Sequence, residues 1–227
     1  MRFLNIAHRG ASFDAPENTL EAFRLALEQG ADMIETDLHL TVDRAIALHH
    51  DATLGGVGIG EFPLAELRVC APAIPTLEEA LDLIEDRIPF NLELKTGGGE
   101  AVYEGLEARV LEEVRARGLL RRTLFSSFSV SVLTRLRDLE PKARIGLLAS
   151  GSAESEIDER ARDVGAEAVH LHWSQARRER IEKLHELGFR VHVYTVDDPE
   201  RQRQLLEWQV DGIFTNVPAR LHALIGR

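Results

Sequence analysis

The sequence is poor in the residues that mark several classes of protein. Its 227 residues include a single cysteine, Cys70, so a disulfide within the chain is impossible. It carries 27 Lys and Arg against 38 Asp and Glu, a formal net charge of −11. This shortage of positive charge argues against nucleic acid or an anionic membrane as the main partner. An anionic small molecule stays possible, because a bound cation and a few basic residues can reverse the local sign.

Long apolar runs are also missing. No run approaches the roughly 18 residues that a membrane-spanning helix needs. The apolar start, Phe3–Ala7, is too short for a signal peptide and leads directly into His8-Arg9-Gly10. We therefore expect a cytoplasmic protein without stable membrane association. Its oligomeric state is not indicated by any of these features.

What is present is an alternation of short apolar runs with longer amphipathic ones. The composition, 44% hydrophobic and 29% charged, is that of a globular protein. The expected strands are Phe3–Ala7, Asp32–Leu38, Ala45–His50, Ile88–Lys95, Thr123–Ser127, Arg144–Leu148, Ala168–His172, Arg190–Val196 and Gly212–Thr215. The expected helices are Thr19–Gln29, Leu77–Asp86, Ala101–Arg117, Val130–Leu139, Ala153–Val164, Gln175–Leu187, Pro199–Trp208 and Pro218–Leu224.

This alternation predicts an α/β fold with a parallel sheet. If Ala45–His50 is a hairpin return after Asp32–Leu38, the other strands are each followed by a helix. That pattern favours a closed (β/α)8 TIM barrel, which folds as a single domain at this length, here residues 1–227. The segment Leu54–Gly60 contains four glycines and could be an active-site loop or an ordinary surface turn.

Ionisable side chains gather near the ends of the first strands. In a barrel, chemistry lies at the carboxyl ends of the strands and in the loops that follow them. The first strand ends in His8-Arg9, the second carries Glu35 and Asp37, the hairpin return ends in His50-Asp51, and the next strand carries Glu93 and Lys95. Ionisable groups in such apolar surroundings are costly unless they are paired or bind a metal.

The spacing places these groups on one side of the strands. Residues two apart on a strand face the same way, so Glu35 and Asp37 point together, as do Glu93 and Lys95. The apolar residues between them point toward the helices. Neighbouring carboxylates repel, and a divalent cation removes that repulsion; all-oxygen ligands suit Mg²⁺ or Ca²⁺. A single Glu-x-Asp on a strand is usually solvated. The joint occurrence of ionisable residues at the ends of the first strands is what indicates a site.

Motifs along almost the whole chain carry a resemblance to a known family. They are His8-Arg9-Gly10-Ala11, Pro16-Glu17-Asn18-Thr19, Glu35-x-Asp37, His50-Asp51, Thr53-Leu54, Pro75-Thr76-Leu77-Glu78-Glu79, Glu93-Leu94-Lys95, Ser127-Phe128, Tyr194-Thr195-Val196 and Gly212-Ile213-Phe214-Thr215-Asn216. In this order they resemble the glycerophosphodiester phosphodiesterase family. The resemblance implies a hydrolase of lipid and glycerol metabolism on a TIM barrel. It would use a divalent cation to cleave a glycerophosphodiester to an alcohol and glycerol 3-phosphate.

The resemblance also implies roles for particular residues. Glu35, Asp37 and Glu93 would bind the metal, His8 and His50 would be the acid–base pair, and Arg9 and Lys95 would bind phosphate. Phe128 and Tyr194 end strands and could line the substrate pocket, although an aromatic residue there is as often simple packing. Parity places His49 opposite His50, away from the site. The sequence leaves open which histidine is the acid, and whether water or a substrate hydroxyl attacks the phosphorus.

Some features remain ambiguous or depart from the family. Asn18 could contact the metal site or His8, but we favour a helix-capping role for it. The segment between His50 and Pro75 is shorter than in many relatives, and Tyr194 stands where many have tryptophan. These departures concern the choice of alcohol group more than the reaction. Because a short segment covers little of the mouth, we expect several head groups to be accepted.

Three other functions compete with this interpretation. A phospholipase C or D acting on intact lipids would require exposed apolar loops, of which the segment 54–63 offers few. A catalytically silent barrel that serves as a binding module would be expected to lack one of the ionisable groups, and all are present. A metal-dependent sugar-phosphate isomerase or epimerase would not need His8-Arg9 beside the Glu-x-Asp pair.

Overall fold

The strands close into a parallel barrel. The structure is a computed structural model that describes residues 2–97 and 103–226. Within these residues the barrel strands are β1 (Leu4–His8), β2 (Met33–Leu40), β6 (Phe90–Leu94), β7 (Leu124–Ser127), β8 (Arg144–Ala149), β9 (Ala168–His172), β10 (Arg190–Tyr194) and β11 (Gly212–Thr215). They pair in parallel in chain order, and β1 pairs with both β2 and β11, which closes the ring. The predicted single-domain (β/α)8 barrel is confirmed.

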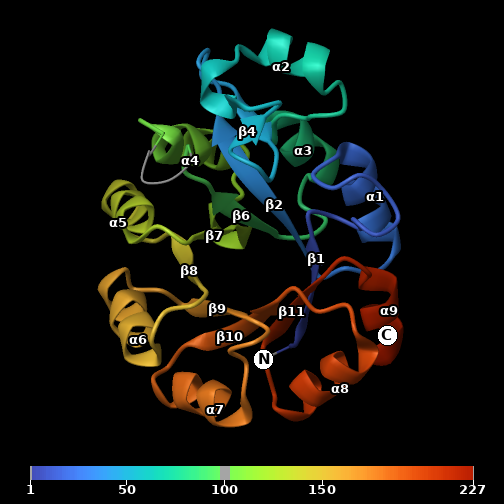
Figure 1. Ribbon diagram of the computed structural model, residues 1–227, viewed down its shortest axis with the longest axis vertical. Coiled ribbons are helices and arrows are strands. Elements are labelled where there is room, and N and C mark those ends of the chain that lie inside the picture. The colour runs from blue at the N-terminus through green and yellow to red at the C-terminus, as the bar shows by residue number, and fades with distance from the viewer. Residues whose placement is uncertain (1, 98–102, 227) are drawn as a thin grey trace.

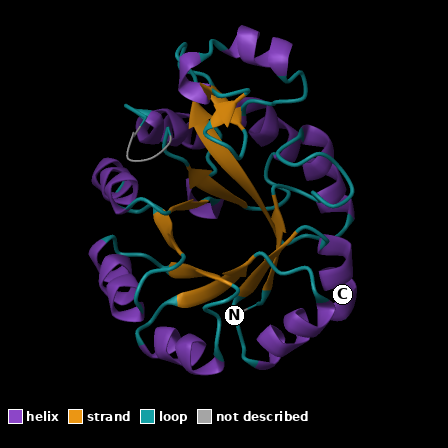
Figure 2. Ribbon diagram, in the orientation of Figure 1, coloured by secondary structure: helices purple, strands orange, loops and turns teal. Residues whose placement is uncertain are grey.

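A ring of helices surrounds the strands (Figures 1 and 2). Its members are α1 (Leu20–Glu28), α3 (Leu77–Ile84), α4 (Leu106–Ala116), α5 (Val130–Leu139), α6 (Glu154–Asp163), α7 (Arg178–Glu186), α8 (Pro199–Glu207) and α9 (Pro218–Leu224). Several begin at a side chain that accepts a backbone N–H, as Thr19 does from Ala22 and Asp198 does from Arg201. These caps stabilise the starts of α1 and α8, which follow loops at the barrel mouth.

The apolar residues form two layers. The larger one lies between strands and helices and includes Ile34, Leu92 and Leu94, as the alternation along β2 and β6 predicts. The smaller one fills the inside of the barrel with Ile6, Met33, Leu124 and Phe214. The buried imidazoles of His170 and His192 stack against Phe214 there, with ring centroids 5.0 and 6.2 Å from it. The lower interior is therefore a packed core.

One excursion interrupts the regular alternation. The short strand β3 (Ile46–Leu48) runs antiparallel to β2, which confirms the predicted hairpin return. It is followed by the two-residue strands β4 (Thr53–Leu54) and β5 (Val57–Gly58), the 3-10 turn η1 (Ile59–Glu61) and the helix α2 (Leu64–Cys70). These elements stand outside the ring, at the top of Figure 1. The sequence analysis missed them because each is too short to show a period.

The predicted helix Ala101–Arg117 is wrong at its start. Residues 101 and 102 lie outside the described part of the chain, and α4 begins only at Leu106. Gly105 precedes it with φ 80°, a left-handed conformation that breaks an incoming helix and that glycine adopts without strain. In the described residues no helix is both long and apolar enough to cross a membrane.

Candidate active site at the barrel mouth

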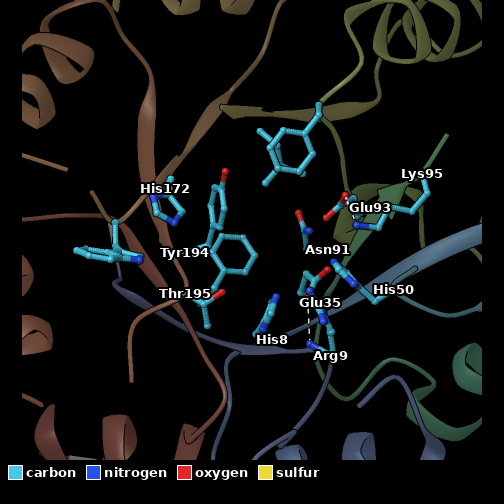
Figure 3. A pocket seen from close by; sticks show the side chains of 14 residues that line it. His8, Arg9, Glu35, His50, Asn91, Glu93, Lys95, His172, Tyr194 and Thr195 are labelled. Atoms are coloured by element: carbon cyan, nitrogen blue, oxygen red, sulfur yellow. Dashed lines mark hydrogen bonds and ion pairs between the residues drawn. The ribbon is translucent and has the colours of Figure 1, made fainter. Parts of the chain in front are cut away.

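A cavity of about 320 Å³ opens at the carboxyl ends of the strands. Its lining residues are His8, Arg9, Glu35, His50, Asn91, Glu93, Lys95, Phe128, Leu148, His172, Trp173, Tyr194, Thr195 and Phe214. Figure 3 shows His50, Glu93 and Lys95 on one side and His172 and Tyr194 on the other. Of the nine residues predicted for the site, eight line this cavity, and Asp37 lies directly behind it.

Three buried carboxylates form the floor of the charged side. Glu35 and Asp37 project from β2, and Glu93 projects from β6, where it pairs in register with Asp37. One oxygen from each of the three lies within 4.8 Å of the others. Oxygen ligands at this spacing fit a divalent cation such as Mg²⁺ or Ca²⁺. The period-two spacing that predicted a common side for Glu35 and Asp37 therefore agrees with the geometry.

Two positively charged side chains, Lys95 and Arg9, hold the carboxylates in place. Lys95 Nζ lies 2.8 Å from an oxygen of Asp37 and 2.7 Å from one of Glu93. Arg9 Nε lies 3.2 Å from the other oxygen of Asp37. Asn18 Nδ2 donates to the same oxygen at 2.8 Å, so the helix-capping role that we favoured for Asn18 is wrong. Thr19 caps α1 instead, because its hydroxyl reaches the N–H of Ala22.

The pKa values of the carboxylates differ with the balance of these charges. Burial raises the pKa of Asp37, but Lys95 and Arg9 outweigh it and bring the pKa to about 2. Burial raises the pKa of Glu93 to about 7, although Lys95 opposes the change. Burial, then repulsion from Asp37 and Glu93, raises the pKa of Glu35 well above its usual range. Negative charge is thus in excess here, and a divalent cation would remove the excess.

His8 ends β1 and Arg9 begins the sharp turn that follows, and both side chains reach the cavity. The turn needs Gly10, whose φ is 85° and whose missing Cβ would lie 2.7 Å from the main chain of Ala22. The backbone N–H of Arg9 donates to Glu35 Oε2 at 2.9 Å, the contact dashed in Figure 3. Burial, assisted by the charge of Arg9, lowers the pKa of His8 to about 4. The turn therefore presents a neutral imidazole beside a guanidinium.

His50 comes from the loop after β3 and is partly exposed. It lies two residues beyond β3, and its side chain is 38% exposed. Its Nδ1 lies 2.8 Å from Asp51 Oδ1. The neighbouring His49 lines a separate shallow groove with Pro16 and Leu48. The prediction that His50, rather than His49, faces the site agrees with these positions.

The other side of the cavity is aromatic. Phe128 follows β7, Tyr194 ends β10, and His172 ends β9. Tyr194 lies 6.1 Å from the Phe128 ring and 5.7 Å from the His172 ring, both nearly edge to face. Trp173 packs beside His172 at 5.4 Å. Such a wall suits the carbon part of a small ligand.

The sequence analysis assigned no role to several residues of this site. His172 and Trp173 stand at a strand end, the position that identified the other site residues, but no partner motif drew attention to them. Asn91 precedes Glu93 by two residues and shares its side of β6; its Oδ1 is buried without a hydrogen-bond partner among the described residues. Asn216 lies 2.8 Å from His8 Nδ1 and was noticed only as part of a motif.

Fold and cavity together define a class, a TIM barrel whose mouth gathers three carboxylates, a lysine, an arginine and several imidazoles around one cavity. Comparison with known proteins identifies the family within that class. Residues 8–220 match the glycerophosphoryl diester phosphodiesterase family. A glycerophosphodiester phosphodiesterase of Caldanaerobacter subterraneus is 32% identical, over 99% of this chain and 98% of that protein. The chain therefore belongs to the glycerophosphoryl diester phosphodiesterase family, which confirms the predicted enzyme class.

Solved structures agree with this result. A phosphodiesterase of Oleispira antarctica in complex with the product sn-glycerol-3-phosphate is 30% identical, with a TM-score of 0.86, covering 98% of this chain and 96% of that one. A glycerophosphodiester phosphodiesterase of Agrobacterium tumefaciens is 27% identical, with a TM-score of 0.83, covering 98% of this chain and all of that one. The likeness extends over entire chains, so the barrel has no large added or missing part relative to these two.

Proposed function

We propose that this protein hydrolyses glycerophosphodiesters to an alcohol and glycerol 3-phosphate with a divalent cation. The observation that carries the proposal is the meeting of three carboxylates, two basic side chains and the imidazoles of His8 and His50 around one cavity of about 320 Å³. The product found in the Oleispira antarctica relative supports the same substrate class. The partner of this protein would accordingly be a small molecule. The cytoplasmic location expected from the sequence stays a prediction.

The metal would be held by Glu35, Asp37 and Glu93. Their oxygen atoms lie close enough together for one ion, and all-oxygen ligation favours Mg²⁺ or Ca²⁺. When bound, the ion neutralises charge on the non-bridging oxygens of the phosphodiester. Arg9 and Lys95 add fixed positive charge on the same side of the cavity, and each is already positioned by Asp37. Preorganised charge of this kind favours the transition state over the bound substrate.

Proton transfer would fall to His8 and His50. His8 ends β1 and His50 follows β3, so the two imidazoles reach the cavity from different segments of the chain, as a separate proton donor and acceptor require. One would remove the proton from the attacking water or substrate hydroxyl, and the other would protonate the leaving alkoxide. Phe128 and Tyr194 would contact the carbon skeleton of the glycerol unit, so that the phosphate faces the charged side.

Assay of the purified protein tests this proposal. Glycerophosphocholine should yield glycerol 3-phosphate, detected by a coupled dehydrogenase. EDTA should abolish turnover, and Mg²⁺ or Ca²⁺ added in excess should restore it. Full activity in EDTA would exclude the metal-dependent mechanism. Absence of glycerol 3-phosphate with every added cation would exclude the substrate class.

A further inference from the structure

A chain of hydrogen bonds runs from α8 to His8 behind the cavity. Asp197 and Asn216 lie just beyond β10 and β11, two strands that are neighbours in the barrel. Asp197 Oδ2 accepts from Asn216 Nδ2 at 2.7 Å, and Asp197 Oδ1 accepts from the backbone N–H of Asn216 at 2.7 Å. Asn216 Oδ1 lies 2.8 Å from His8 Nδ1. The carboxylate therefore acts on the imidazole through one amide.

The chemistry of these groups decides which way the amide points. An ionised carboxylate only accepts hydrogen bonds, so the group of Asn216 that faces Asp197 must be the NH₂. The amide oxygen then faces His8, and an amide oxygen also only accepts. The hydroxyl of Ser12 lies 2.8 Å from this oxygen and 2.8 Å from the backbone oxygen of His8, and its single hydrogen can serve either acceptor, so the direction of the amide rests on Asp197. His8 Nδ1 must therefore carry the proton in this contact.

We propose that Asp197 and Asn216 are positioning residues that hold neutral His8 in its Nδ1–H tautomer and aim the free Nε2 into the cavity for proton transfer. The tautomer follows from the contacts alone, whereas its catalytic use rests on the proposed function. A histidine with its proton on Nε2 would present a donor to the cavity and would leave Asn216 Oδ1 without its imidazole donor. Asp197 and Asn216 thus favour one of the two tautomers of the neutral His8 ring, which are close in energy.

The far end of the chain is anchored in the core. Thr215 donates its hydroxyl to Asp197 Oδ1 at 2.9 Å. Gln202 of α8 is fully buried, and its amide NH₂ donates to the backbone oxygen of Val196 at 2.8 Å, next to Asp197. His50 has a different arrangement, since its partner Asp51 is 71% exposed. Of the two imidazoles, His8 is the one whose orientation is fixed by the barrel itself.

Exchange of the two side chains gives a direct test. Asp197→Asn removes the group that orients the Asn216 amide, so part of the His8 population should move its proton to Nε2. Combining Asp197→Asn with Asn216→Asp restores one carboxylate and one amide in reversed order. The new carboxylate at 216 accepts from His8 Nδ1, and the new amide at 197 donates to it. The double variant should recover the Nδ1–H tautomer.

The tautomer is measured by ¹⁵N NMR of the histidine ring nitrogens, with His8 assigned by its absence in His8→Gln. Asp198→Asn is the matched control, because it removes the adjacent carboxylate, which caps α8 and does not touch Asn216. In parallel, kcat should fall about 10–100-fold in Asp197→Asn with KM little changed, the usual effect of losing a residue that orients a histidine. The double variant should regain most of kcat, and Asp198→Asn should stay near the unaltered enzyme.

Two results would overturn the inference. One is a His8 ring protonated on Nε2 in the unaltered protein. The other is Asp197→Asn with unchanged tautomer and kcat while circular dichroism shows it folded. If instead the unaltered protein shows the Nδ1–H tautomer but cleaves no glycerophosphodiester, the proposed function fails and the positioning inference stands, because NMR needs no turnover.

Discussion

The two sides of the cavity are built on different principles. The charged side comes from β1, β2 and β6, and its members hold one another, as Lys95 and Arg9 hold Asp37. The aromatic side comes from β7, β9 and β10; Phe128 is 42% and Trp173 48% exposed there. Electrostatic preorganisation requires fixed groups, whereas contact with a carbon skeleton tolerates movable ones. We therefore expect changes on the charged side to affect turnover and changes on the aromatic side to affect substrate choice.

The largest effect is expected from the metal-binding carboxylates. Glu35→Gln and Asp37→Asn each keep the size of the side chain but remove a charged ligand. Both should abolish activity and reduce cation affinity in calorimetric titration without unfolding the barrel. Near-normal turnover of either variant in EDTA would contradict the metal site.

The histidines come next. His8→Ala and His50→Ala should each lower kcat about 10²–10⁴-fold, the range for losing a general acid or base. The control is His49→Ala, which removes an imidazole from the neighbouring groove and should change kcat far less. Steady-state kinetics on one diester suffice to compare the three. Equal losses at positions 49 and 50 would contradict the assignment of His50.

Substrate choice tests how the alcohol end of the diester is held. Among the described residues that line the cavity, none comes from the segment 51–75, so we expect this end of the substrate to be weakly held. Glycerophosphocholine, glycerophosphoethanolamine and glycerophosphoglycerol should have similar kcat/KM, because discrimination needs contacts that differ between them. A preference above about 100-fold, or about 2.7 kcal/mol, would indicate that the segment closes over the substrate.

The smallest effect on activity is expected from changes to the buried histidines below the cavity, His170 and His192. Burial lowers the pKa of His192 to about 4 and the pKa of His170 well below its usual value. In the unfolded chain both imidazoles bind a proton near pH 6.5, whereas in the folded protein they stay neutral to lower pH. The free energy of unfolding is therefore highest above pH 6.5 and falls as pH drops toward 4. His192 alone accounts for up to about 3 kcal/mol of this loss. Urea unfolding at pH 7 and pH 4 measures it.

A matched pair of variants separates the loss of stability caused by His192 from acid unfolding caused by other groups. His192→Leu should flatten the fall in stability between pH 7 and pH 4, because the apolar side chain binds no proton. His222→Leu removes a partly exposed imidazole on α9 and should leave the slope close to that of the unaltered protein. Both should keep near-normal kcat at pH 7. An unchanged slope in His192→Leu would show that other groups control acid unfolding.

Much of the fold and of the charged side could be predicted from the sequence, for a physical reason. Alternation along a strand is a local property, so Glu35 and Asp37 could be placed together from their spacing alone. The order of strands and helices then brought Glu93 and Lys95 to the same mouth. The family resemblance supplied the roles, which the contacts of Lys95 and Arg9 with Asp37 now support.

What could not be predicted depends on contacts between residues far apart in the chain. Asn18 reaches Asp37 because its backbone adopts φ 55°, and no local sequence pattern predicts this conformation. The partnership of His8 with Asn216 spans 208 positions, and Asp197 acts on it from a third loop. The short elements between residues 51 and 70 have too few residues for a period to be visible.

The packed layer beneath the cavity also determines how molecules come and go. Phe214, His170 and His192 fill the barrel below the site, so the described residues leave no second opening through the interior. Under the proposed function, both products would depart through the opening by which the diester enters. Glycerol 3-phosphate would face Arg9, Lys95 and the metal site, so we expect it to be retained longer than the alcohol. We therefore expect accumulated glycerol 3-phosphate to compete with the substrate for this opening and to slow turnover.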